Sequence, residues 1–257
     1  MKLRVLGCHG GIGGHEVHTT AFLLDEDVLI DAGTGVTTLG VEALARIDEV
    51  FLTHAHLDHI AALPLLVDTV GDRRTRPLRV HALPATLDAL RQHIFNGIIW
   101  PNFSRIPTCD SPYLQLVPLP TGAAVDLGEG RSVQPLPACH TVPAVGYLMR
   151  SARGSVAFSG DTGACPAFWD ALTALDDLHA IIVECALPEQ SASLAQAAGH
   201  FTPRTLAGAM RAFPRRDIPL YITHMKPGQM TAIVEEIDAM GRAFSPRFLH
   251  SGQLIEI

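Results

Sequence analysis

The stretch FLTHAHLDHI, residues 51–60, places three histidines and an aspartate within six positions, directly behind an apolar run. In extended backbone His54 and His56 lie on one face, because side chains alternate with a period of two, so both imidazoles can reach one ion. A turn after them would bring Asp58 and His59 toward a second ion. Imidazole and carboxylate together suit zinc, iron or manganese rather than calcium. We therefore expect ligands for two metal positions; the alternative is a polar loop with a helix-capping aspartate.

Three further candidate ligands also follow apolar, strand-like runs. His140 comes after VQPLPAC, Asp161 after SVAFSG and His224 after PLYIT. Residues at the ends of strands can converge on one edge of a sheet, and binding groups concentrate on loops that a rigid scaffold holds. This placement predicts one metal centre assembled from distant parts of the chain.

Short β-like runs alternate with helical ones along the whole chain and are bounded by glycine and proline. We expect helices at residues 41–47, 85–95, 205–213 and 230–240. We expect strands at residues 4–7, 20–24, 28–33, 49–53, 79–83, 113–119, 133–138, 146–150, 155–160, 179–187, 219–224, 247–250 and 254–257. Strands dominate both halves and no biased segment separates them. The pattern predicts one α/β domain over residues 1–257, with two sheets packed face to face between helices.

The composition narrows the classes of partner. A formal net charge of −7 disfavours long RNA or DNA, since nucleic-acid binders usually carry a basic footprint that neutralises phosphates. The N-terminus lacks the apolar region of a signal peptide, and no apolar run approaches the length of about 18 residues that spans a membrane. We expect a cytoplasmic protein that does not enter the membrane.

The five cysteines are odd in number, widely scattered and never in CxxC spacing. This argues against both a disulfide framework and a cysteine-type zinc site. We expect all of them to be reduced, buried thiols: Cys8, Cys109, Cys139, Cys165 and Cys185.

The order of the motifs resembles that of the metallo-β-lactamase fold hydrolases. THAHLDH, the isolated His140, SGDTG with Asp161 and THMKP with His224 follow one another in the family's order over nearly the whole chain. The resemblance implies an αββα sandwich of two mixed sheets, with two divalent metal ions at one edge. Zn²⁺ is the expected metal, with Mn²⁺ or iron as alternatives.

The resemblance also implies a role for each candidate ligand. His54, His56 and His140 would hold the first ion, Asp58, His59 and His224 the second, and Asp161 would bridge them. Many true β-lactamases of this fold have a cysteine ligand where this chain has Asp161, so that branch is excluded. Asp31 in LIDAGTG resembles the aspartate that orients a ligand histidine in the fold, and a turn-capping role is the alternative.

Two metal ions about 3.5 to 4 Å apart can activate a bridging hydroxide that attacks phosphorus. Glu184 ends an apolar strand, and a loop could bring it to His200. A carboxylate favours the protonated form of a nearby imidazole, so His200 could donate a proton to the leaving oxygen. With Asp58 these two form the expected catalytic set. A helix-entry loop, with Thr202 capping a helix that starts at Pro203, is a compatible structural explanation.

Two segments carry the resemblance to a substrate class. The Glu184 segment with GHFTP resembles the phosphodiesterase branches of the fold, and HIFN with IWPN resembles the class II 3′,5′-cyclic nucleotide phosphodiesterases. This implies hydrolysis of cAMP or cGMP to the 5′-nucleotide. Trp100 and Phe103 could stack on the base with Asn102 beside them, and Lys226 could meet a phosphate oxygen. An apolar core contact and a solvated lysine are the alternatives.

Rival functions remain open. A nuclease of the tRNA 3′-end-processing type shares the ligands, but the chain has no arm rich in lysine and arginine. A thioesterase or lactonase of the same fold, or a cyclic nucleotide-binding sensor without turnover, would share the site. A homodimer is a common default. His9, His15 and His18 stay unassigned, and the glycines around them would serve tight turns or a close backbone approach to the site.

Overall fold

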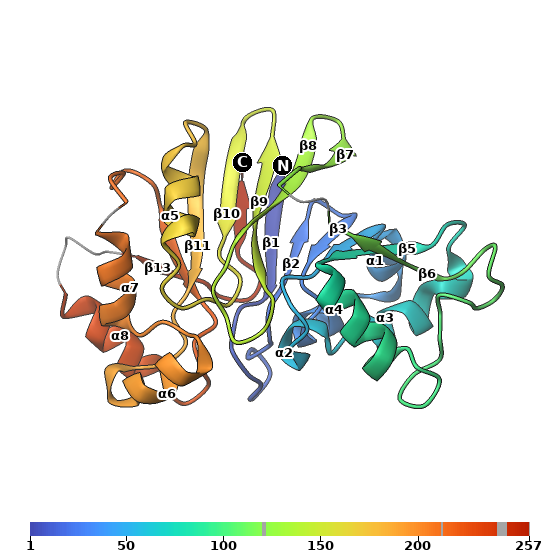
Figure 1. The fold of residues 1–257 in the computed structure, drawn as a ribbon, viewed down its shortest axis with the longest axis horizontal. Coiled ribbons are helices and arrows are strands. Elements are labelled where there is room, and N and C mark those ends of the chain that lie inside the picture. Colours follow the sequence, from blue (N-terminus) through green and yellow to red (C-terminus); the bar gives the residue numbers. More distant parts are fainter. Residues whose placement is uncertain (120–121, 212, 241–245, 257) are drawn as a thin grey trace.

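Two seven-stranded sheets pack face to face in the computed structural model, and helices cover the outer face of each (Figure 1). The structure describes residues 1–119, 122–211, 213–240 and 246–256, to which every structural statement below refers. The expected αββα sandwich is confirmed. The expected helix over 205–213 includes position 212, and the expected strand over 254–257 includes position 257; both positions lie outside the described residues.

The first sheet runs in the order β14–β1–β2–β3–β4–β5–β6. Its strands are β1 Lys2–Gly7, β2 Ala21–Leu24, β3 Val28–Ile30, β4 Glu49–Phe51, β5 Leu78–Ala82, β6 Leu114–Pro118 and β14 Leu254–Glu256. Pairing is antiparallel from β14 to β3 and parallel from β3 to β6. The sheet is therefore mixed, as expected.

The second sheet runs in the order β13–β12–β11–β10–β9–β8–β7. Its strands are β7 Val125–Gly128, β8 Arg131–Pro137, β9 Val145–Ser151, β10 Gly154–Phe158, β11 Leu178–Glu184, β12 Leu220–Thr223 and β13 Arg247–Phe248. Pairing is antiparallel from β7 to β10 and parallel from β10 to β13. Each sheet thus changes from antiparallel to parallel pairing partway across.

Helices from the two halves of the chain cover opposite faces (Figure 1). The first sheet carries α1 Val41–Arg46, α2 Leu57–Ile60, α3 Leu63–Val70, α4 Pro84–Ala89 and the π-helical turn η3 Leu90–Ile94. The second carries α5 Pro166–Thr173, α6 Ala192–Ala198, α7 Pro203–Met210 and α8 Met230–Asp238. Short 3₁₀ turns lie at η1 Thr34–Thr38, η2 Gly71–Arg73 and η4 Glu189–Ser191. The sequence pattern did not single out α2, α3, α5 or α6, and the four residues of α2 are too few to show the 3.6-residue period.

The apolar layer between the sheets draws on both halves of the chain. Phe22 of the first sheet meets Phe158 of the second edge to face, with ring centroids 5.0 Å apart. Phe51 meets Tyr147 in the same way at 5.8 Å, and the buried Tyr147 hydroxyl donates to the Leu52 carbonyl at 2.6 Å. Aromatic pairs of this kind stabilise the fold beyond the burial of their apolar area. The buried hydroxyl has a hydrogen-bond partner in place of water. These contacts hold the end of β4 against the second sheet.

One edge of the sandwich collects the carboxyl ends of the strands that precede the candidate ligands. β10, β11 and β12 are parallel to one another, so they end on the same side. The end of β4 joins them across the sheets, because the Val145 amide donates to the Thr53 carbonyl at 3.0 Å. Ligands of open α/β sheets bind outside the carboxyl ends of strands. The fold thus brings the sequence-distant candidates to one place.

The cysteines only partly follow the expectation. Cys8, Cys165 and Cys185 are buried, but Cys109 and Cys139 are exposed, so the prediction of five buried thiols is wrong for these two. Both lie in loops: Cys109 between η3 and β6, and Cys139 two residues after the end of β8.

Within the described part of the chain, no helix combines the length and the apolar character that crossing a membrane requires.

Arg131 joins the two sheets at the end opposite the candidate ligands. From the start of β8 it donates to Asp27 at 2.7 Å and to Asp25 at 3.0 Å, both in the turn between β2 and β3. The guanidinium is largely buried, and its hydrogen bond holds the pKa of the Asp27 carboxyl below its ordinary value of 3.8. The pair therefore stabilises the fold at neutral pH and loses this contribution as the pH falls below 3.8 through the lower folded-state pKa.

We expect Arg131→Met to lower the free energy of unfolding by about 1 to 2 kcal/mol at pH 7, since the carboxylates are about a third exposed and water screens them. Urea denaturation from pH 7 to pH 3 measures the effect, and the difference from the unaltered protein should narrow at the acidic end. Arg153→Met, in the exposed turn between β9 and β10, is the control because Arg153 has no ion pair among the described residues. Equal losses in both variants would contradict a specific inter-sheet bond.

Candidate metal centre

The seven expected ligands meet at the strand-end edge as two groups. The ligand atoms of His54, His56 and His140 lie within 4.8 Å of one another, and those of Asp58, His59, Asp161 and His224 form a second group of the same width. Asp161 lies between the groups, because its Oδ2 atom is 3.2 Å from His59 Nε2 and 3.7 Å from His54 Nε2. The geometry therefore places each expected ligand in its expected group; Asp161 belongs to the second group and is also grouped with His140 and His200 as a possible metal site.

The local backbone of residues 54–59 follows the expected turn. His54 and His56 leave the end of β4 in extended conformation, and their ring centroids are 4.6 Å apart. His56 then precedes α2, which carries Asp58 and His59 in its single turn. One short segment thus serves both groups because it changes from extended to helical backbone between His56 and Leu57.

A buried network around Asp31 orients histidines of both groups. His59 Nδ1–H donates to Asp31 Oδ2 at 2.7 Å. The Thr53 hydroxyl also donates to Asp31 at 2.9 Å and accepts from His54 Nδ1–H at 2.9 Å. Since each Nδ1 carries its proton in these bonds, the Nε2 lone pair of each ring is free for a metal. Asp31 therefore orients His59 directly and His54 through Thr53.

Several buried atoms of the two groups have no hydrogen-bond partner among the described residues: His54 Nε2, His59 Nε2, His224 Nε2 and Asp161 Oδ1. A buried polar atom without a partner costs free energy, so such atoms are rare in folded proteins. On the first group, His140 Nδ1–H donates to the Gly199 carbonyl, and His140 Nε2 faces His56 Nδ1 at 3.1 Å. The ligand atoms of each group lie close together, and a cation bound between them would give the unpartnered atoms a partner.

The charge balance of the site also favours cations. Burial lowers the pKa of His54 well below its ordinary value and that of His224 to about 3, so both rings are neutral lone-pair donors. Burial alone would lower the pKa of His59, but the carboxylates of Asp161 and Asp31 raise it well above its ordinary value. The carboxylates therefore favour a positive charge beside Asp161, which a bound cation would supply. Nitrogen and carboxylate ligands in two groups fit two divalent ions of the zinc, manganese or iron type.

Backbone strain marks the segment that carries His224. His224 has a φ of +62°, which is uncommon for a residue other than glycine, and its amide donates to the Cys8 carbonyl at 2.7 Å. Gly10 packs against it so closely that a Cβ at Gly10 would lie 2.6 Å from the His224 carbonyl and 2.8 Å from its ring. The expected close backbone approach of the glycine-rich segment to the site is confirmed at Gly10.

Glu184 and His200 form the expected pair beside the metal groups. His200 Nδ1–H donates to Glu184 Oε1 at 2.8 Å, and the His200 ring lies 5.1 Å from the His140 ring and 5.2 Å from the His224 ring. Burial lowers the pKa of His200, but the Glu184 carboxylate outweighs this and the pKa is raised. The helix-entry explanation holds as well, because the Thr202 side chain caps α7 and Pro203 is its first residue. The imidazole is therefore held, protonated at Nδ1, at the edge of the site.

An open groove of about 790 Å³ adjoins the first group. It is lined by Leu83, Gln196, Gly199 and the loop of residues 138–144, which includes His140. Apart from His140, sequence reasoning named none of these residues as binding residues, since small and apolar residues in loops carry no local signal of a groove. Of the seven candidate ligands, His140 alone lines this groove.

The expected aromatic surface for a nucleobase is only partly available. Phe103 is 5% exposed and packs in the core of the first half, with Phe95 and Tyr113 around its ring, so the prediction that it stacks on a base is wrong. The free energy gained by burying the apolar ring in the core favours this position over one exposed to a ligand. Trp100 is partly buried against the same core, and the Asn102 side chain accepts from Ser104 within its turn. The binding roles of Trp100 and Asn102 stay predictions.

Lys226 and the unassigned histidines take different places. Lys226 Nζ donates to the Gly10 carbonyl at 2.7 Å, which keeps its ammonium beside the loop that covers His224. Its positive charge acts on His200, so a phosphate contact stays a prediction for a lysine near the site. His9 is buried and its amide donates to the His18 carbonyl, whereas His15 is exposed in the glycine-rich loop.

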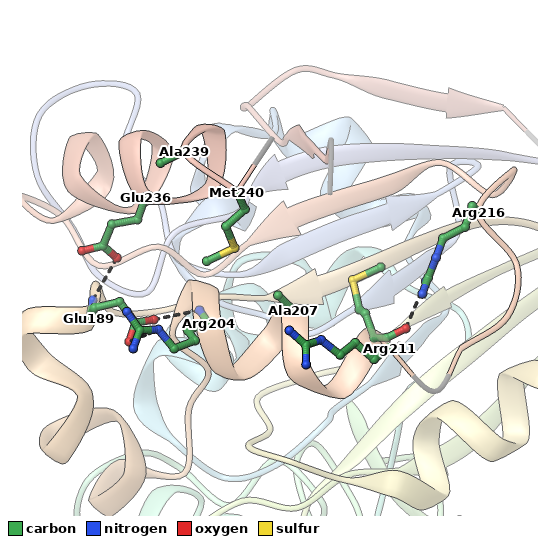
Figure 2. A pocket seen from close by; sticks show the side chains of 9 residues that line it. Glu189, Arg204, Ala207, Arg211, Arg216, Glu236, Ala239 and Met240 are labelled. Carbon is green, nitrogen blue, oxygen red and sulfur yellow. Dashed lines mark hydrogen bonds and ion pairs between the residues drawn. The ribbon is translucent and has the colours of Figure 1, made fainter. Parts of the chain in front are cut away.

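A separate hollow of about 660 Å³ lies between α7 and α8, away from the ligands (Figure 2). At its rim the Glu189 amide donates to the Glu236 carboxylate at 2.9 Å, and Glu189 accepts from the Arg204 amide at 2.7 Å. Glu189 thus ties the segment before His200 to both helices. The hollow contains none of the metal-ligating groups, and its walls brace the segment that carries His200.

Comparison with known proteins places this geometry in context. The family model described as the beta-lactamase superfamily domain matches residues 26–243. The chain is 30% identical over 134 residues to ribonuclease Z of Bradyrhizobium sp. strain ORS 278, which covers 49% of this chain and 42% of that protein. It is 27% identical over 208 residues to a probable 3′,5′-cyclic-nucleotide phosphodiesterase of Yersinia pestis, which covers 70% of this chain and 57% of that protein. The chain therefore spans about half the length of these two curated relatives.

A solved structure supports the assignment of the fold. The crystal structure of unliganded yeast PDE1 superposes with a TM-score of 0.81 at 18% identity, over 98% of each chain. At this identity the likeness concerns the fold alone.

We expect Asp31→Asn to weaken metal binding by about 10- to 100-fold, because an NH₂ group would replace one of the two carboxylate oxygens. One oxygen accepts from His59 Nδ1–H and the Thr53 hydroxyl, and the other accepts from the Thr53 amide. Asparagine tolerates the φ of +59° at this position, so the backbone should keep its path. Metal content after dialysis against a chelator measures the loss, and circular dichroism checks the fold. Asp88→Asn, an exposed aspartate of α4, is the control. Unchanged metal binding would leave Asp31 with a turn-capping role alone.

Proposed function

The chain belongs to the beta-lactamase superfamily, a family of metallo-β-lactamase fold hydrolases, and on that premise we propose that it is a dinuclear metal-dependent phosphodiesterase. Its proposed substrates are 3′,5′-cyclic nucleotides, cAMP or cGMP, and its proposed products are 5′-nucleotides. The observation that carries this proposal is the Glu184–His200 pair, which stands beside two metal-ligand groups that share Asp161.

Two bound divalent ions would make water a nucleophile at neutral pH and neutralise charge on the phosphoryl oxygens. The task of the chain is to fix the ligands before substrate arrives. Asp31 holds His59 through its Nδ1 atom, the Thr53 hydroxyl holds His54 through its Nδ1 atom, and the Gly199 carbonyl holds His140 in the same way. Side chains held in this manner need little rearrangement during the reaction.

His200 is the proposed proton donor for the 3′ leaving oxygen. Its Nδ1–H is engaged by Glu184, so its Nε2–H is the proton to be transferred. Glu184 also accepts from the Thr162 amide at 3.1 Å, which ties the pair to the loop of Asp161. Donor and metal-ligand loop therefore keep a constant relative position, which proton transfer in the transition state requires.

The groove beside His140 supports a small substrate over a long nucleic acid. None of its described lining residues is lysine or arginine, and the whole chain carries a formal net charge of −7. A polynucleotide gains much of its affinity from neutralised phosphates, which this groove does not offer. The relative named as a phosphodiesterase aligns over 70% of the chain and the one named as ribonuclease Z over 49%, which also favours the cyclic nucleotide.

Ribonuclease activity is the second candidate, because the ribonuclease Z relative is 30% identical and the metal ligands would serve either reaction. A basic surface elsewhere on the molecule would have to hold the tRNA. Hydrolysis of a thioester or lactone, and binding of a cyclic nucleotide without turnover, remain alternatives that the same assay addresses.

We expect the metal-loaded protein to hydrolyse cAMP or cGMP to the 5′-nucleotide and to leave thioesters and lactones intact. A panel of cAMP, cGMP, their 2′,3′ isomers, a precursor tRNA, a thioester and a lactone, resolved by chromatography, measures this. His54→Ala, which removes a ligand of the first group, should lose activity together with metal content. Cleavage of the precursor tRNA alone would support the nuclease, and binding of cAMP with no product would support the sensor.

We expect His200→Ala to lower kcat for the cyclic nucleotide by about 10²- to 10⁴-fold, because the alkoxide leaves without a proton. The loss should be much smaller for bis(p-nitrophenyl) phosphate, since p-nitrophenolate is a stable leaving group. His179→Ala, an exposed histidine on β11, is the matched control. An equal loss on both substrates, with metal content unchanged, would rule out a proton-donor role and leave His200 as a positioning residue.

A further inference from the structure

The hollow between α7 and α8 has a floor of small and flexible apolar side chains (Figure 2). Ala207 of α7 and Ala239, which directly follows α8, line it together with Met210 and Met240. Two alanines leave space that larger side chains would fill in a close-packed interior. Methionine side chains are unbranched and adapt to apolar groups of different shapes. With a volume of about 660 Å³, the hollow has the size of an ordinary small-molecule site and a floor that suits an aliphatic chain.

The two ends of this hollow differ in charge (Figure 2). At one end the Glu236 carboxylate accepts from the Glu189 amide at 2.9 Å, and the Glu189 carboxylate accepts from the Arg204 amide at 2.7 Å. At the other end lie Arg211 and Arg216, and neither has an acidic partner among the described residues. The acidic groups are therefore engaged within the fold, whereas the two guanidinium groups at the opposite end lack a counter-charge.

The two arginines are placed where one anion can reach both. Arg216 Nη1–H donates to the Met210 carbonyl at 3.0 Å, which holds this guanidinium near the last turn of α7. Arg211 directly follows Met210, and its exposed side chain makes no hydrogen bond or ion pair with the described residues. A guanidinium can form two parallel hydrogen bonds to a carboxylate, and its charge strengthens both. An anionic head group at this end would therefore complete the polar contacts that the fold leaves open.

We propose that this hollow is a binding site for an aliphatic carboxylate, with the chain on the apolar floor and the carboxylate at Arg211 and Arg216. The acidic end repels the carboxylate and so sets the direction in which the molecule lies. Arg204 and Arg211 are seven residues apart along α7 and its C-cap, which corresponds to about 10 Å, roughly the length of a decyl chain. The site is separate from the metal centre, because none of its described lining residues is a candidate metal ligand.

Titration calorimetry of the metal-loaded protein with decanoate tests the proposal without any hydrolysis. We expect decanoate to bind at least about tenfold more tightly than decanol, which has the chain without the charge, and than acetate, which has the charge without the chain. Protein stripped of metal by a chelator should bind decanoate with the same affinity. Binding that disappears with the metal would place the carboxylate on the metal centre and overturn the proposed site, and equal binding of decanol would overturn the part assigned to charge.

Variants locate the bound molecule. Arg211→Gln should weaken decanoate binding about tenfold, because a neutral amide replaces the guanidinium, whereas Arg153→Gln, in the exposed turn between β9 and β10, should bind as the unaltered protein does. Ala207→Phe should fill the hollow and abolish binding, and Ala85→Phe, at an exposed position of α4, is its control. Unchanged affinity in Arg211→Gln would overturn the role of the arginines, and full binding by folded Ala207→Phe would overturn the location.

Discussion

One buried carboxylate, Asp31, sets the orientation of histidines in both metal groups. It accepts from His59 directly and from the Thr53 hydroxyl, which in turn accepts from His54. A histidine can present either nitrogen, and the bond at Nδ1 decides which one remains for a metal. Without this network the rings would keep their places in the sequence but lose their common direction. The φ of +59° at Asp31 shows that the backbone accepts an uncommon conformation to put the carboxylate there.

The packing of the two sheets supports this hydrogen-bond network. Its two sheets are held together by the aromatic layer of Phe22, Phe51, Tyr147 and Phe158, and at the far end by Arg131 with its two aspartates. The Tyr147 hydroxyl fixes the Leu52 carbonyl, two residues before the first ligand. A close-packed protein interior transmits small shifts. The positions of the ligand loops therefore depend on the packing beneath them.

The site divides its tasks between groups of residues. Five imidazoles and two carboxylates form the two metal-ligand groups, and the hydrogen-bonded Glu184–His200 pair lies at their edge. The groove beside His140 has a mostly small and apolar lining that includes no lysine or arginine among the described residues.

Local sequence by itself indicated the candidate ligands, the strand ends that carry them and the Thr202 cap, because these follow from residue patterns within a few positions. The αββα sandwich followed from the order of strands and helices together with the family resemblance. The four-residue helix α2 escaped detection, since a single turn is too short to show a period. Only the tertiary structure decided that Asp31 serves two histidines and that Phe103 is buried in the core. Each of these depends on which distant segments pack together, and burial and hydrogen bonding between distant segments leave no local pattern in the chain.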